Sequence, residues 1–455
     1  MIHPHPTVGI YTLGCKVNQY ESEAIAERFA DEGFDVCPPQ DVCDVYIINT
    51  CTVTGESDRK ARQFIRRAIR RNPAAYILVT GCFSQTAPEA AAAIAGVDFI
   101  CGNADKQAVV GAAKALLENG RKNDRPDLFT EPPDAHGFET MRIRRFDRTR
   151  AYVKIEDGCE NRCTYCIIPA ARGSVRSKLP DDVVAEVSEL TAGGCREVVL
   201  TGIETASYGR DLPDCTLADL LERVDKIPDV GRVRLGSLDP SLMKQLFVDR
   251  IARLRSLTPH FHLSVQSGSD AVLARMKRKY NSRMALEGME RLRRAIPDVM
   301  FTTDIIVGFP QETEEEFSET LDFIRRARFL TIHVFPYSRR KGTEADRMSG
   351  QIPEAVKHER VRVLAEEQAR IRRELLGEAS GRRAEVLFET FENGTAYGHT
   401  PNFIEVGCPS PVPLRGELRP VQIGGNDGTV CTGEILPSGA NGNMDPSIST
   451  HGTRS

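Results

Sequence analysis

The sequence predicts a multidomain α/β protein, with a parallel α/β sheet domain first, a partial (β/α)6 barrel in the centre and a small β-barrel at the end. Three observations predict this class. The chain has 455 residues, which is more than one hydrophobic core usually organises. Short β-rich apolar runs alternate with helical patterns over most of its length. A later stretch is punctuated by glycine and has no helical period.

The first predicted domain spans residues 1–118. Strands joined by helices pair in parallel, so alternating strand and helix patterns predict a parallel α/β sheet. Residues 119–150 are rich in Asn, Asp, Arg and Pro without a sustained apolar period, and they predict a linker. The strand and helix patterns of the first domain alternate in the order 8–13, 21–32, 44–49, 59–71 and 76–80.

The predicted central barrel spans residues 151–376. Helical patterns at residues 181–191, 282–295 and 313–326 make the crossovers long enough for parallel pairing. In such a barrel the chemistry belongs at the C-terminal ends of the strands. The six expected strands are residues 152–155, 197–201, 232–235, 261–265, 301–307 and 332–335.

The last part of the chain is predicted to contain a charged helix, a small β-barrel and a disordered tail. A charged helical pattern begins at residue 353 and ends near 376. Residues 377–436 contain short strands separated by glycine and predict a small β-barrel. Residues 437–455 are mostly Gly, Asn, Ser and Thr, which predicts a disordered tail.

The composition excludes several classes of protein. The longest apolar stretch, residues 90–100, is interrupted by Gly96 and Asp98, so no membrane span is expected. The amino terminus lacks the basic start and apolar block of a secretory signal, which favours a cytoplasmic location. Lys and Arg number 60 against 64 Asp and Glu, a net charge of −4. A nucleic-acid partner would therefore have to be held by local patches.

Thirteen cysteines in a reducing compartment favour metal ligands, catalytic groups or buried small side chains over disulfides. Cys159, Cys163 and Cys166, the barrel cysteine set, form a C-x3-C-x2-C motif after the first barrel strand. Three thiolates on such a loop can hold a 4Fe-4S cluster and leave one iron open to a small molecule. The alternative is structural zinc, which normally has a fourth Cys or His nearby. No histidine occurs between His136 and His260.

A second group of cysteines is dispersed along the first domain. Cys15, Cys51 and Cys82, the N-terminal cysteine set, each follow a predicted strand. The C-terminal ends of parallel strands share one edge of a sheet, so these thiols are expected to converge. Cys101 also follows an apolar run, and position alone leaves open which three bind metal. The other cysteines are expected to be small buried residues, namely Cys37, Cys43, Cys195, Cys215, Cys408 and Cys431.

These motifs resemble the radical S-adenosylmethionine (SAM) enzymes. The C-x3-C-x2-C loop, with Tyr165 before its last cysteine, looks like that superfamily, and the upstream cysteines resemble its methylthiotransferase branch. The stretch Thr12-Leu-Gly-Cys-Lys-Val-Asn-Gln-Tyr-Glu21 is similar to the opening of the bacterial threonylcarbamoyladenosine tRNA methylthiotransferases. At the same position, the isopentenyladenosine enzymes carry a motif similar to Gly-Cys-Gln-Met-Asn. The ribosomal-protein aspartate enzymes carry one similar to Gly-Cys-Pro-Lys-Asn. The resemblance spans residues 7–436, with further matches at 200–202, 262–269, 304–310 and 336–343, and at 397–403 to the terminal TRAM barrel.

The resemblance implies two 4Fe-4S clusters and SAM as cofactors. The cluster on the barrel cysteine set would reduce SAM to a 5′-deoxyadenosyl radical, which would remove hydrogen from C2 of the adenine. The cluster on the N-terminal set would deliver a methylthio group to that carbon of threonylcarbamoyladenosine, in a tRNA anticodon stem-loop. An electron donor of unknown identity is also implied. The alternative acceptors are isopentenyladenosine and a ribosomal-protein aspartate, and a rival from another class is a non-catalytic iron–sulfur RNA-binding protein.

Polar residues at the ends of barrel strands are candidates for SAM binding, because hydroxyl and amide groups there can bind ribose and methionyl groups. Asp304 and Arg172 are weaker candidates. His262 lies in mid-strand and is expected to be a satisfied core histidine, so no catalytic residue is expected beyond the cluster ligands. The candidates for SAM are Thr201, Gly202, Ser237, Ser264 and Gln266.

Several basic segments are candidates for tRNA contact. Residues 59–71 contain seven basic side chains and no acidic one, and Phe64, Ala68 and Ile69 are expected to face the core and leave Arg66, Arg67, Arg70 and Arg71 free for phosphates. Smaller patches lie at residues 142–150, 275–280 and 339–341.

The terminal module is acidic. Residues 378–436 carry four basic and eight acidic side chains, so bulk charge opposes phosphate binding there. An RNA contact would need a local surface of stacking and hydrogen-bonding groups, including Tyr397, His399 and Asn402. The alternative role is that of a structural or docking barrel.

Overall fold

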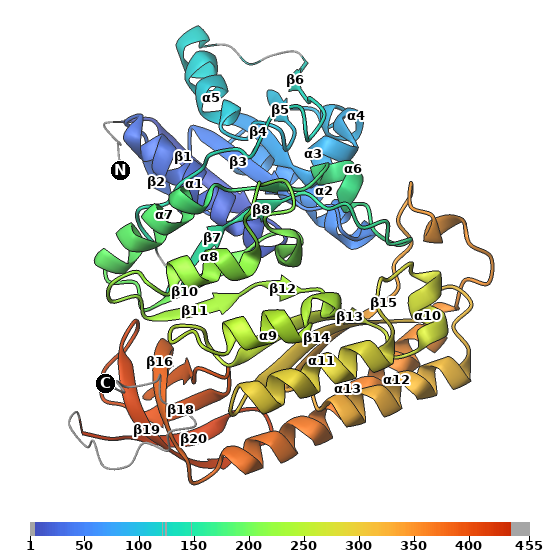
Figure 1. Ribbon diagram of the computed structural model, residues 1–455. Helices are drawn as coiled ribbons and strands as arrows, with labels where there is room; N and C mark the ends of the chain where they lie inside the picture. Colours follow the sequence, from blue (N-terminus) through green and yellow to red (C-terminus); the bar gives the residue numbers. More distant parts are fainter. Residues whose placement is uncertain (1–4, 121, 123–124, 147, 438–455) are drawn as a thin grey trace.

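The computed structural model describes residues 5–120, 122, 125–146 and 148–437. The predicted disordered tail lies outside these residues from position 438 onward. Figure 1 shows an N-terminal sheet domain above a central barrel, with the C-terminal barrel beside the base of the latter. None of the helices in the described ranges is both long and apolar enough to cross a membrane.

The N-terminal domain is the expected parallel α/β sheet, with the strand order β2-β1-β3-β4-β5-β6. Every side chain of β3 and β4 is buried, because helices cover both faces of the central strands. The strands are β1 (Thr7–Thr12), β2 (Asp35–Cys37), β3 (Val45–Thr50), β4 (Tyr76–Gly81), β5 (Phe99–Cys101) and β6 (Asp127–Phe129). The helices are α1 (Lys16–Asp31), α2 (Gly55–Arg71), α3 (Cys82–Thr86), α4 (Pro88–Ala92) and α5 (Ala108–Asn119).

Strand β6 lies inside the segment that the sequence predicts to be a linker. It pairs in parallel with β5 and forms an edge of the sheet. All three of its side chains are exposed, although Leu128 and Phe129 are apolar, and three residues are too few to show the alternation that would predict a strand.

The central domain is an open barrel of parallel strands, and all six predicted strands are confirmed. It consists of one sheet in the order β11-β10-β7 and another in the order β12-β13-β14-β15. The strands are β7 (Ala151–Lys154), β10 (Glu197–Thr201), β11 (Arg232–Leu235), β12 (Ser237–Leu238), β13 (His260–Gln266), β14 (Met300–Val307) and β15 (Thr331–Pro336). The covering helices are α7 (Pro180–Ala192), α8 (Leu217–Val224), α9 (Gln245–Ile251), α10 (Asp270–Arg275), α11 (Ser282–Ala295) and α12 (Glu314–Ala327).

A long helix, α13 (Glu354–Ala379), connects the central domain to the C-terminal barrel (Figure 1). The terminal module is a closed barrel in the order β16-β17-β18-β20-β19, as the sequence predicts. Its strands are β16 (Arg383–Glu392), β17 (Thr395–His399), β18 (Glu405–Pro409), β19 (Leu418–Asn426) and β20 (Cys431–Ile435).

Phe403, in the loop between β17 and β18, attaches this barrel to the central domain. Its ring stacks on His260 of β13 and on His399, each with a centroid distance of 4.5 Å. The guanidinium of Arg234 lies 4.7 Å from the same ring. Asn402 is buried and donates a hydrogen bond to the carbonyl of Asp298. His399 and Asn402 are thus used in docking the barrel, which favours its alternative role as a docking module over an RNA-binding surface that includes these two side chains.

Candidate functional site

The barrel cysteine set lies on a loop whose two ends are held together by backbone hydrogen bonds. The loop leaves β8 (Glu156–Asp157), and the chain returns along β9 (Arg176–Ser177), which pairs antiparallel with β8. The N–H of Cys159 donates to the carbonyl of Gly173 at 3.0 Å, and that of Cys166 donates to Cys163 at 3.0 Å. Gly158, with φ +89°, has no room for a Cβ, which would lie 1.9 Å from the carbonyl oxygen of Ser174.

The three thiols of this loop interact with one another. Burial raises the pKa of both Cys159 and Cys166 to about 12, and a neighbouring cysteine of the set contributes to each shift. Such thiols are protonated at neutral pH unless positive charge, supplied by a metal, stabilises the thiolates.

Arg278 supplies one positive group beside this loop. Its Nη1 donates to Sγ of Cys163 at 3.2 Å, and its Nη2 contacts Asp239 and the carbonyl of Ser264, both at 2.9 Å. The sequence does not reveal this role, because Arg278 lies in a basic run that resembles a phosphate-binding patch.

Glu204 is a second group near this loop that the sequence does not predict. Asn161, inside the loop, donates to its carboxyl group at 3.3 Å. Burial, reinforced by Asp239, raises the pKa of Glu204 to about 7. All three residues line a cavity of about 580 Å³. The cysteine loop is therefore next to a space with polar walls.

The expected SAM-binding residues occupy different environments. Thr201 is buried at the end of β10. Gly202 is in close contact with Glu156, whose Oε2 would lie 2.5 Å from an added Cβ. Ser237 begins β12 beside His262 of β13. The carbonyl of Ser264 accepts a hydrogen bond from Arg278. Gln266 is the last residue of β13 and has a φ of +68°. Of these residues, Ser264 has the clearest connection to the cysteine loop.

The N-terminal cysteine set converges at the edge of its sheet. Cys15 precedes α1, Cys51 follows β3, and Cys82 begins α3 directly after β4. Gly14 has φ +99°, and a Cβ there would lie 2.9 Å from Sγ of Cys51, so the first two loops touch. Burial raises the pKa of Cys51 to about 11, with Cys82 and Cys15 both contributing. Cys15 retains solvent exposure, yet the surrounding protein still raises the pKa of its thiol.

Cys101 does not belong to this set. Its thiol is buried and donates to the carbonyl of Asp105 at 2.9 Å. Cys101 is also not among the groups that shift the pKa of Cys15 or Cys51. The structure brings together the three cysteines that follow β1, β3 and β4.

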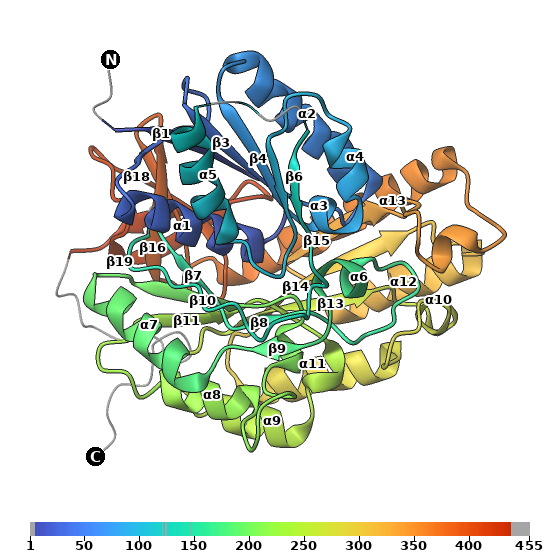
Figure 2. The same cartoon turned by 90° about the horizontal axis from the view of Figure 1, so that it is seen from above.

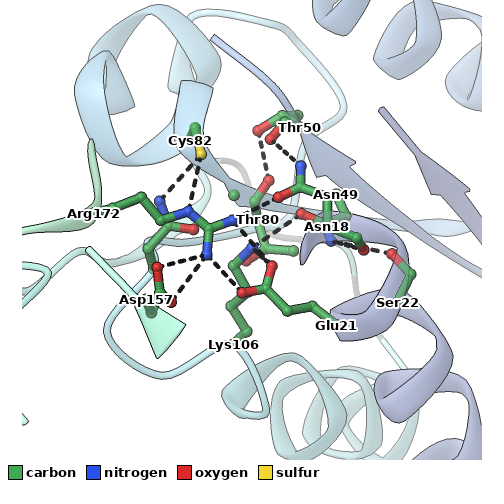
Figure 3. Close-up of polar contacts among 12 residues, drawn as sticks. Asn18, Glu21, Ser22, Asn49, Thr50, Thr80, Cys82, Lys106, Asp157 and Arg172 are labelled. Atoms are coloured by element: carbon green, nitrogen blue, oxygen red, sulfur yellow. Dashed lines mark hydrogen bonds and ion pairs between the residues drawn. The ribbon is translucent and has the colours of Figure 1, made fainter. Parts of the chain in front are cut away.

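Arg172 connects the two halves of the site (Figure 3). It is the last residue of α6 (Ile168–Arg172), which directly follows the barrel cysteine loop and packs against α3 (Figure 2). Its Nε donates to Sγ of Cys82 at 3.4 Å, and its Nη1 contacts Glu21 at 2.7 Å and Asp157 at 3.0 Å. Arg172 is fully buried in this network. The expectation that Arg172 is a weak candidate for SAM binding is wrong, because its guanidinium points to the N-terminal cysteine set.

The network behind Cys82 carries more positive than negative charge. Lys106 and Lys154 both contact Glu21, and Lys154 also contacts Asp157 at 2.7 Å. With Arg172 and with Arg176, which lies 3.8 Å from Asp157, four buried basic side chains surround the carboxylates of Glu21 and Asp157, and burial raises the pKa of the neighbouring Glu139 to about 7. An excess buried cation is costly unless an anion lies nearby. A cluster held by thiolates would be such an anion.

Neither cysteine set is arranged as a compact site for a single ion among the described residues. Zn–S bonds of about 2.3 Å place the sulfurs of a tetrahedral site roughly 3.8 Å apart. Within the described ranges, the one set of three potential ligand atoms found within 4.8 Å of one another is His262, Asp304 and His333. Neither cysteine set is this compact. Three thiols without a close fourth ligand also fit a cluster with one open iron.

His262 and Asp304 lie on the same side of the barrel sheet. His262 is hydrogen-bonded to Thr302 at 2.9 Å and lies 3.3 Å from Asp304. It is half-buried rather than part of the core, so the expectation of a core histidine is only partly correct. Asp304 has no contact with the cysteine loop among the described residues.

Helix α2 carries a basic surface on which Arg59 and Lys60 pair with Glu56, while Arg66, Arg67, Arg70 and Arg71 have no ion pair within the described residues. Its core side chains are Ala61, Ile65 and Ala68, so the buried face is centred on Ile65 rather than on Phe64 and Ile69, which are only half-buried. A cavity of about 400 Å³ lies among Arg59, Arg62, Gln63, Arg66 and Arg70. The helix begins four residues after Cys51, so its first turn is the part of this surface that lies nearest to the N-terminal cysteine set.

The other basic segments are largely neutralised. Arg144 pairs with Glu27 and Asp31, and Arg148 pairs with Glu23. In the other two patches, the paired residues are Arg275, Lys277, Arg278, Arg339 and Arg340. These patches are therefore weaker candidates for phosphate contact than the sequence predicts.

Arg340 of the central domain also contacts the N-terminal domain beside Cys51. It donates to Thr52, the residue after Cys51, and pairs with Asp58 of α2. The Cys51 loop and the Cys82 loop are thus each fixed by an arginine of the central domain, and the two cysteine sets face one shared interface.

Two family models match this chain. Residues 153–324 match the model described as Radical SAM superfamily, and residues 7–102 match the model described as Uncharacterized protein family UPF0004. The matched regions contain the barrel cysteine set and the N-terminal cysteine set.

The chain also resembles curated proteins over nearly its whole length. It is 40% identical to a threonylcarbamoyladenosine tRNA methylthiotransferase of Bacillus subtilis, over 92% of this chain and 93% of that protein. It is 37% identical to a tRNA-2-methylthio-N(6)-dimethylallyladenosine synthase of Moorella thermoacetica, over 86% of this chain and 88% of that protein. Among solved structures, the radical SAM methyltransferase TsrM of Kitasatospora setae matches with a TM-score of 0.55 and 15% identity, over 75% of this chain and 76% of that one. This last similarity supports the fold alone.

Proposed function

This chain belongs to the radical SAM tRNA methylthiotransferases, and we propose that it adds a methylthio group to C2 of N6-threonylcarbamoyladenosine beside the anticodon of tRNA. The observation that carries the proposal is the placement of two separate three-cysteine sets at one interdomain interface. The identity to the Bacillus subtilis enzyme over 92% of the chain supports the acceptor.

The residues that would hold the cofactors divide between the domains. Cys159, Cys163 and Cys166 would hold the 4Fe-4S cluster that binds SAM, and the second cluster would be held by Cys15, Cys51 and Cys82. When bound, these groups supply the one-electron and sulfur-transfer chemistry that an unactivated aromatic C–H bond requires, because no side-chain base removes such a proton near neutral pH.

The protein's own side chains orient and shield these groups. Arg278 places positive charge beside Cys163, and Arg172 does the same beside Cys82, which stabilises thiolates against their burial. Ser264, whose carbonyl is held by Arg278, would contribute to SAM binding with Thr201, Gly202, Ser237 and Gln266. The free arginines of α2 would bind phosphates of the anticodon stem-loop close to the second cluster.

Two aspects of the reaction follow from this assignment. The chemistry needs electrons, so a reductant protein or small donor is a further partner. The tRNA substrate puts the reaction in the cytoplasm. A dimethylallyl-bearing adenosine remains the second candidate acceptor, because the identity to a relative named for that substrate is 37%.

The test uses the full chain reconstituted anaerobically with iron, sulfide, SAM and a reductant. Two synthetic anticodon stem-loops are offered, one with threonylcarbamoyladenosine and one with dimethylallyladenosine, and nucleosides are measured by mass spectrometry. We expect a methylthio product from the first. A product from the second alone would reassign the acceptor, and deoxyadenosine without any methylthio nucleoside would refute transfer. The Cys159→Ala, Cys163→Ala, Cys166→Ala variant is the matched control.

A further inference from the structure

Strand β15 presents an aromatic side chain to the interior of the central barrel. Ile332 of this strand is buried in the core, and helix α13 packs against the strand from outside the barrel (Figure 1). Side chains alternate between the two faces of a strand, so His333 and Phe335 point to the inner face. His333 has a ligand atom within 4.8 Å of those of His262 and Asp304, on the neighbouring strands of this face.

Phe335 differs from the rest of this face. The side chains of His262 and Asp304 are polar and lie 3.3 Å apart in a hydrogen bond. Phe335 is apolar and 47% exposed. Among the exposed large apolar side chains of the described ranges, it is the one that lies on a strand of the central barrel. A half-exposed phenyl ring on a polar face offers a flat apolar surface to a ligand.

The chain that follows Phe335 contacts the N-terminal cysteine set. Ser338 lies against Gly55, the first residue of α2, because a Cβ on Gly55 would lie 3.9 Å from the Oγ of Ser338. Arg340 then donates a hydrogen bond to Thr52, the residue after the second cysteine of that set. The C-terminal end of β15 is therefore held beside the loop that would carry the second cluster.

The same segment also contacts the barrel cysteine loop. The N–H of Ala345 donates to the carbonyl of Thr164, which lies between the second and third cysteines of that loop, at 2.8 Å. Tyr337 belongs to a small buried cluster against which Tyr165 of the loop packs. Phe335, two residues before Tyr337, is thus at the end of a strand whose continuation is bound to both cysteine loops.

The opposite end of the inner face is covered by the terminal barrel. His260 lies two positions before His262 on β13 and therefore on the same face. Its ring stacks on Phe403 with a centroid distance of 4.5 Å. His333 and Phe335 are exposed, whereas His260 is buried. A ligand therefore reaches the inner face from the end near the cysteine sets, where Phe335 lies.

We propose that Phe335 stacks on the target adenine of the tRNA and holds it where the two cysteine sets meet. This proposal rests on the proposed function, in which both sets act on one carbon, C2 of that base. A base that is turned out of its stack exposes a flat face, and aromatic side chains bind such faces. Stacking fixes the plane of the base and leaves its edge uncovered, so C2 stays accessible to the reacting groups.

The test is a double-mutant cycle between the protein and the RNA. Three anticodon stem-loops are used: one with threonylcarbamoyladenosine, one that is abasic at this position, and one that keeps this nucleoside but is abasic at the next nucleotide on the 3′ side. The proteins are the reconstituted parent chain, Phe335→Ala, Phe335→Leu and Phe335→Tyr. Phe129→Ala, which removes another exposed phenylalanine on β6 of the N-terminal sheet, is the matched control.

Four quantities are measured for each protein. Fluorescence anisotropy without SAM gives the affinity for each stem-loop, and equilibrium dialysis gives the affinity for SAM. Mass spectrometry gives the methylthio product and deoxyadenosine. Iron per chain verifies that the clusters are retained.

We expect Phe335→Ala to weaken binding of both stem-loops that contain the target base by about tenfold, within the usual range for one base–aromatic stack. Binding of the stem-loop without that base should be unchanged. Phe335→Tyr should keep the affinity of the parent chain. Phe335→Leu should lose most of it, because leucine is apolar but has no aromatic face. The yield of methylthio product per deoxyadenosine should fall in the Ala and Leu variants alone.

Three results would overturn the proposal while leaving the proposed function intact. Equal loss with all three stem-loops would make Phe335 structural. A loss that disappears only when the neighbouring base is absent would assign the stack to that base. Weaker SAM binding with unchanged RNA binding would assign the ring to the adenine of SAM. If the parent chain itself makes no methylthio product from the first stem-loop, the proposed function fails.

Discussion

The Nε of Arg172 lies 3.4 Å from the Sγ of Cys82, although the two residues are 90 positions apart and belong to different domains. Arg172 follows the barrel cysteine loop after only one short helix. A single buried guanidinium therefore connects the loop that would bind SAM to the cysteines that would hold the second cluster (Figure 3). Because Lys106, Lys154, Arg172 and Arg176 all contact the carboxylates of Glu21 or Asp157, the network has positive charge to offer to an anionic cluster.

Replacement of Arg172 should change the redox behaviour of the second cluster. In a background with Cys159, Cys163 and Cys166 changed to Ala, Arg172→Gln should lower the midpoint potential of the remaining cluster, because loss of positive charge favours the oxidised form. Arg172→Lys should have a smaller effect. The measurement is a potentiometric titration followed by electron paramagnetic resonance. Arg144→Gln is the control, since Arg144 is exposed and pairs with Glu27 and Asp31 away from this network; an unchanged potential in Arg172→Gln would remove Arg172 from this role.

The two cysteine sets should have separable functions. The parent chain should contain about eight iron atoms after reconstitution, and the Cys159, Cys163, Cys166 triple Ala variant should contain about four. That variant should not cleave SAM. The Cys15, Cys51, Cys82 triple Ala variant should also retain about four iron atoms but keep some SAM cleavage without methylthio product. Equal loss of cleavage from both variants would contradict separate roles.

Much of this site could be predicted from the sequence because its cysteines follow simple rules. Cys15, Cys51 and Cys82 follow strands with strong apolar patterns, and parallel topology then brings them to one edge. Cys159, Cys163 and Cys166 are close in sequence, so no tertiary information is needed to group them.

The arginines beside the cysteines could not be predicted in this way. Arg172 meets Glu21 across 151 positions, and Arg278 meets Cys163 across 115. Neither pair has a local pattern, because the contact exists only after the domains pack. The sequence does not predict strand β6 for a related reason: its three residues are too few to show an alternating pattern, and backbone pairing with β5 defines it.

Helix α2 should supply the salt-dependent part of tRNA binding. Arg66, Arg70 and Arg71 are exposed, and changing all three to Gln should weaken binding of an anticodon stem-loop. The slope of log Kd against log salt concentration should fall by about 2 to 3, since each phosphate contact contributes about 0.7 to 0.9. Fluorescence anisotropy at several salt concentrations gives this slope. Arg144→Gln with Arg148→Gln is the matched control, because both arginines are paired with carboxylates. An unchanged slope in the α2 variant would place the RNA elsewhere.

Glu197 should make the attachment of the C-terminal barrel sensitive to acid. Its carboxylate is fully buried and accepts hydrogen bonds from Arg150 at 2.6 Å and Arg234 at 2.7 Å. Burial alone would raise the pKa of Glu197, but Arg234 and Arg150 outweigh it and lower the pKa to about 2. Arg150 in turn pairs with Glu389 of the terminal barrel, so the loss of Glu197 affects the interface between the two barrels.

The sign of this effect follows from the direction of the shift. A carboxyl group whose pKa is lower in the folded state stabilises the fold above its ordinary pKa near 4.5, and this contribution is lost as the pH falls toward 2. Glu197→Gln should therefore lower the free energy of unfolding by about 3 kcal/mol at pH 7 and at pH 5.5, the usual cost of breaking a buried ion pair. The difference from the parent chain should shrink below pH 4.5. Urea unfolding followed by circular dichroism measures both, with Glu359→Gln on the exposed face of α13 as control. A difference that stays constant down to pH 3 would mean that Glu197 acts through packing rather than through its charge.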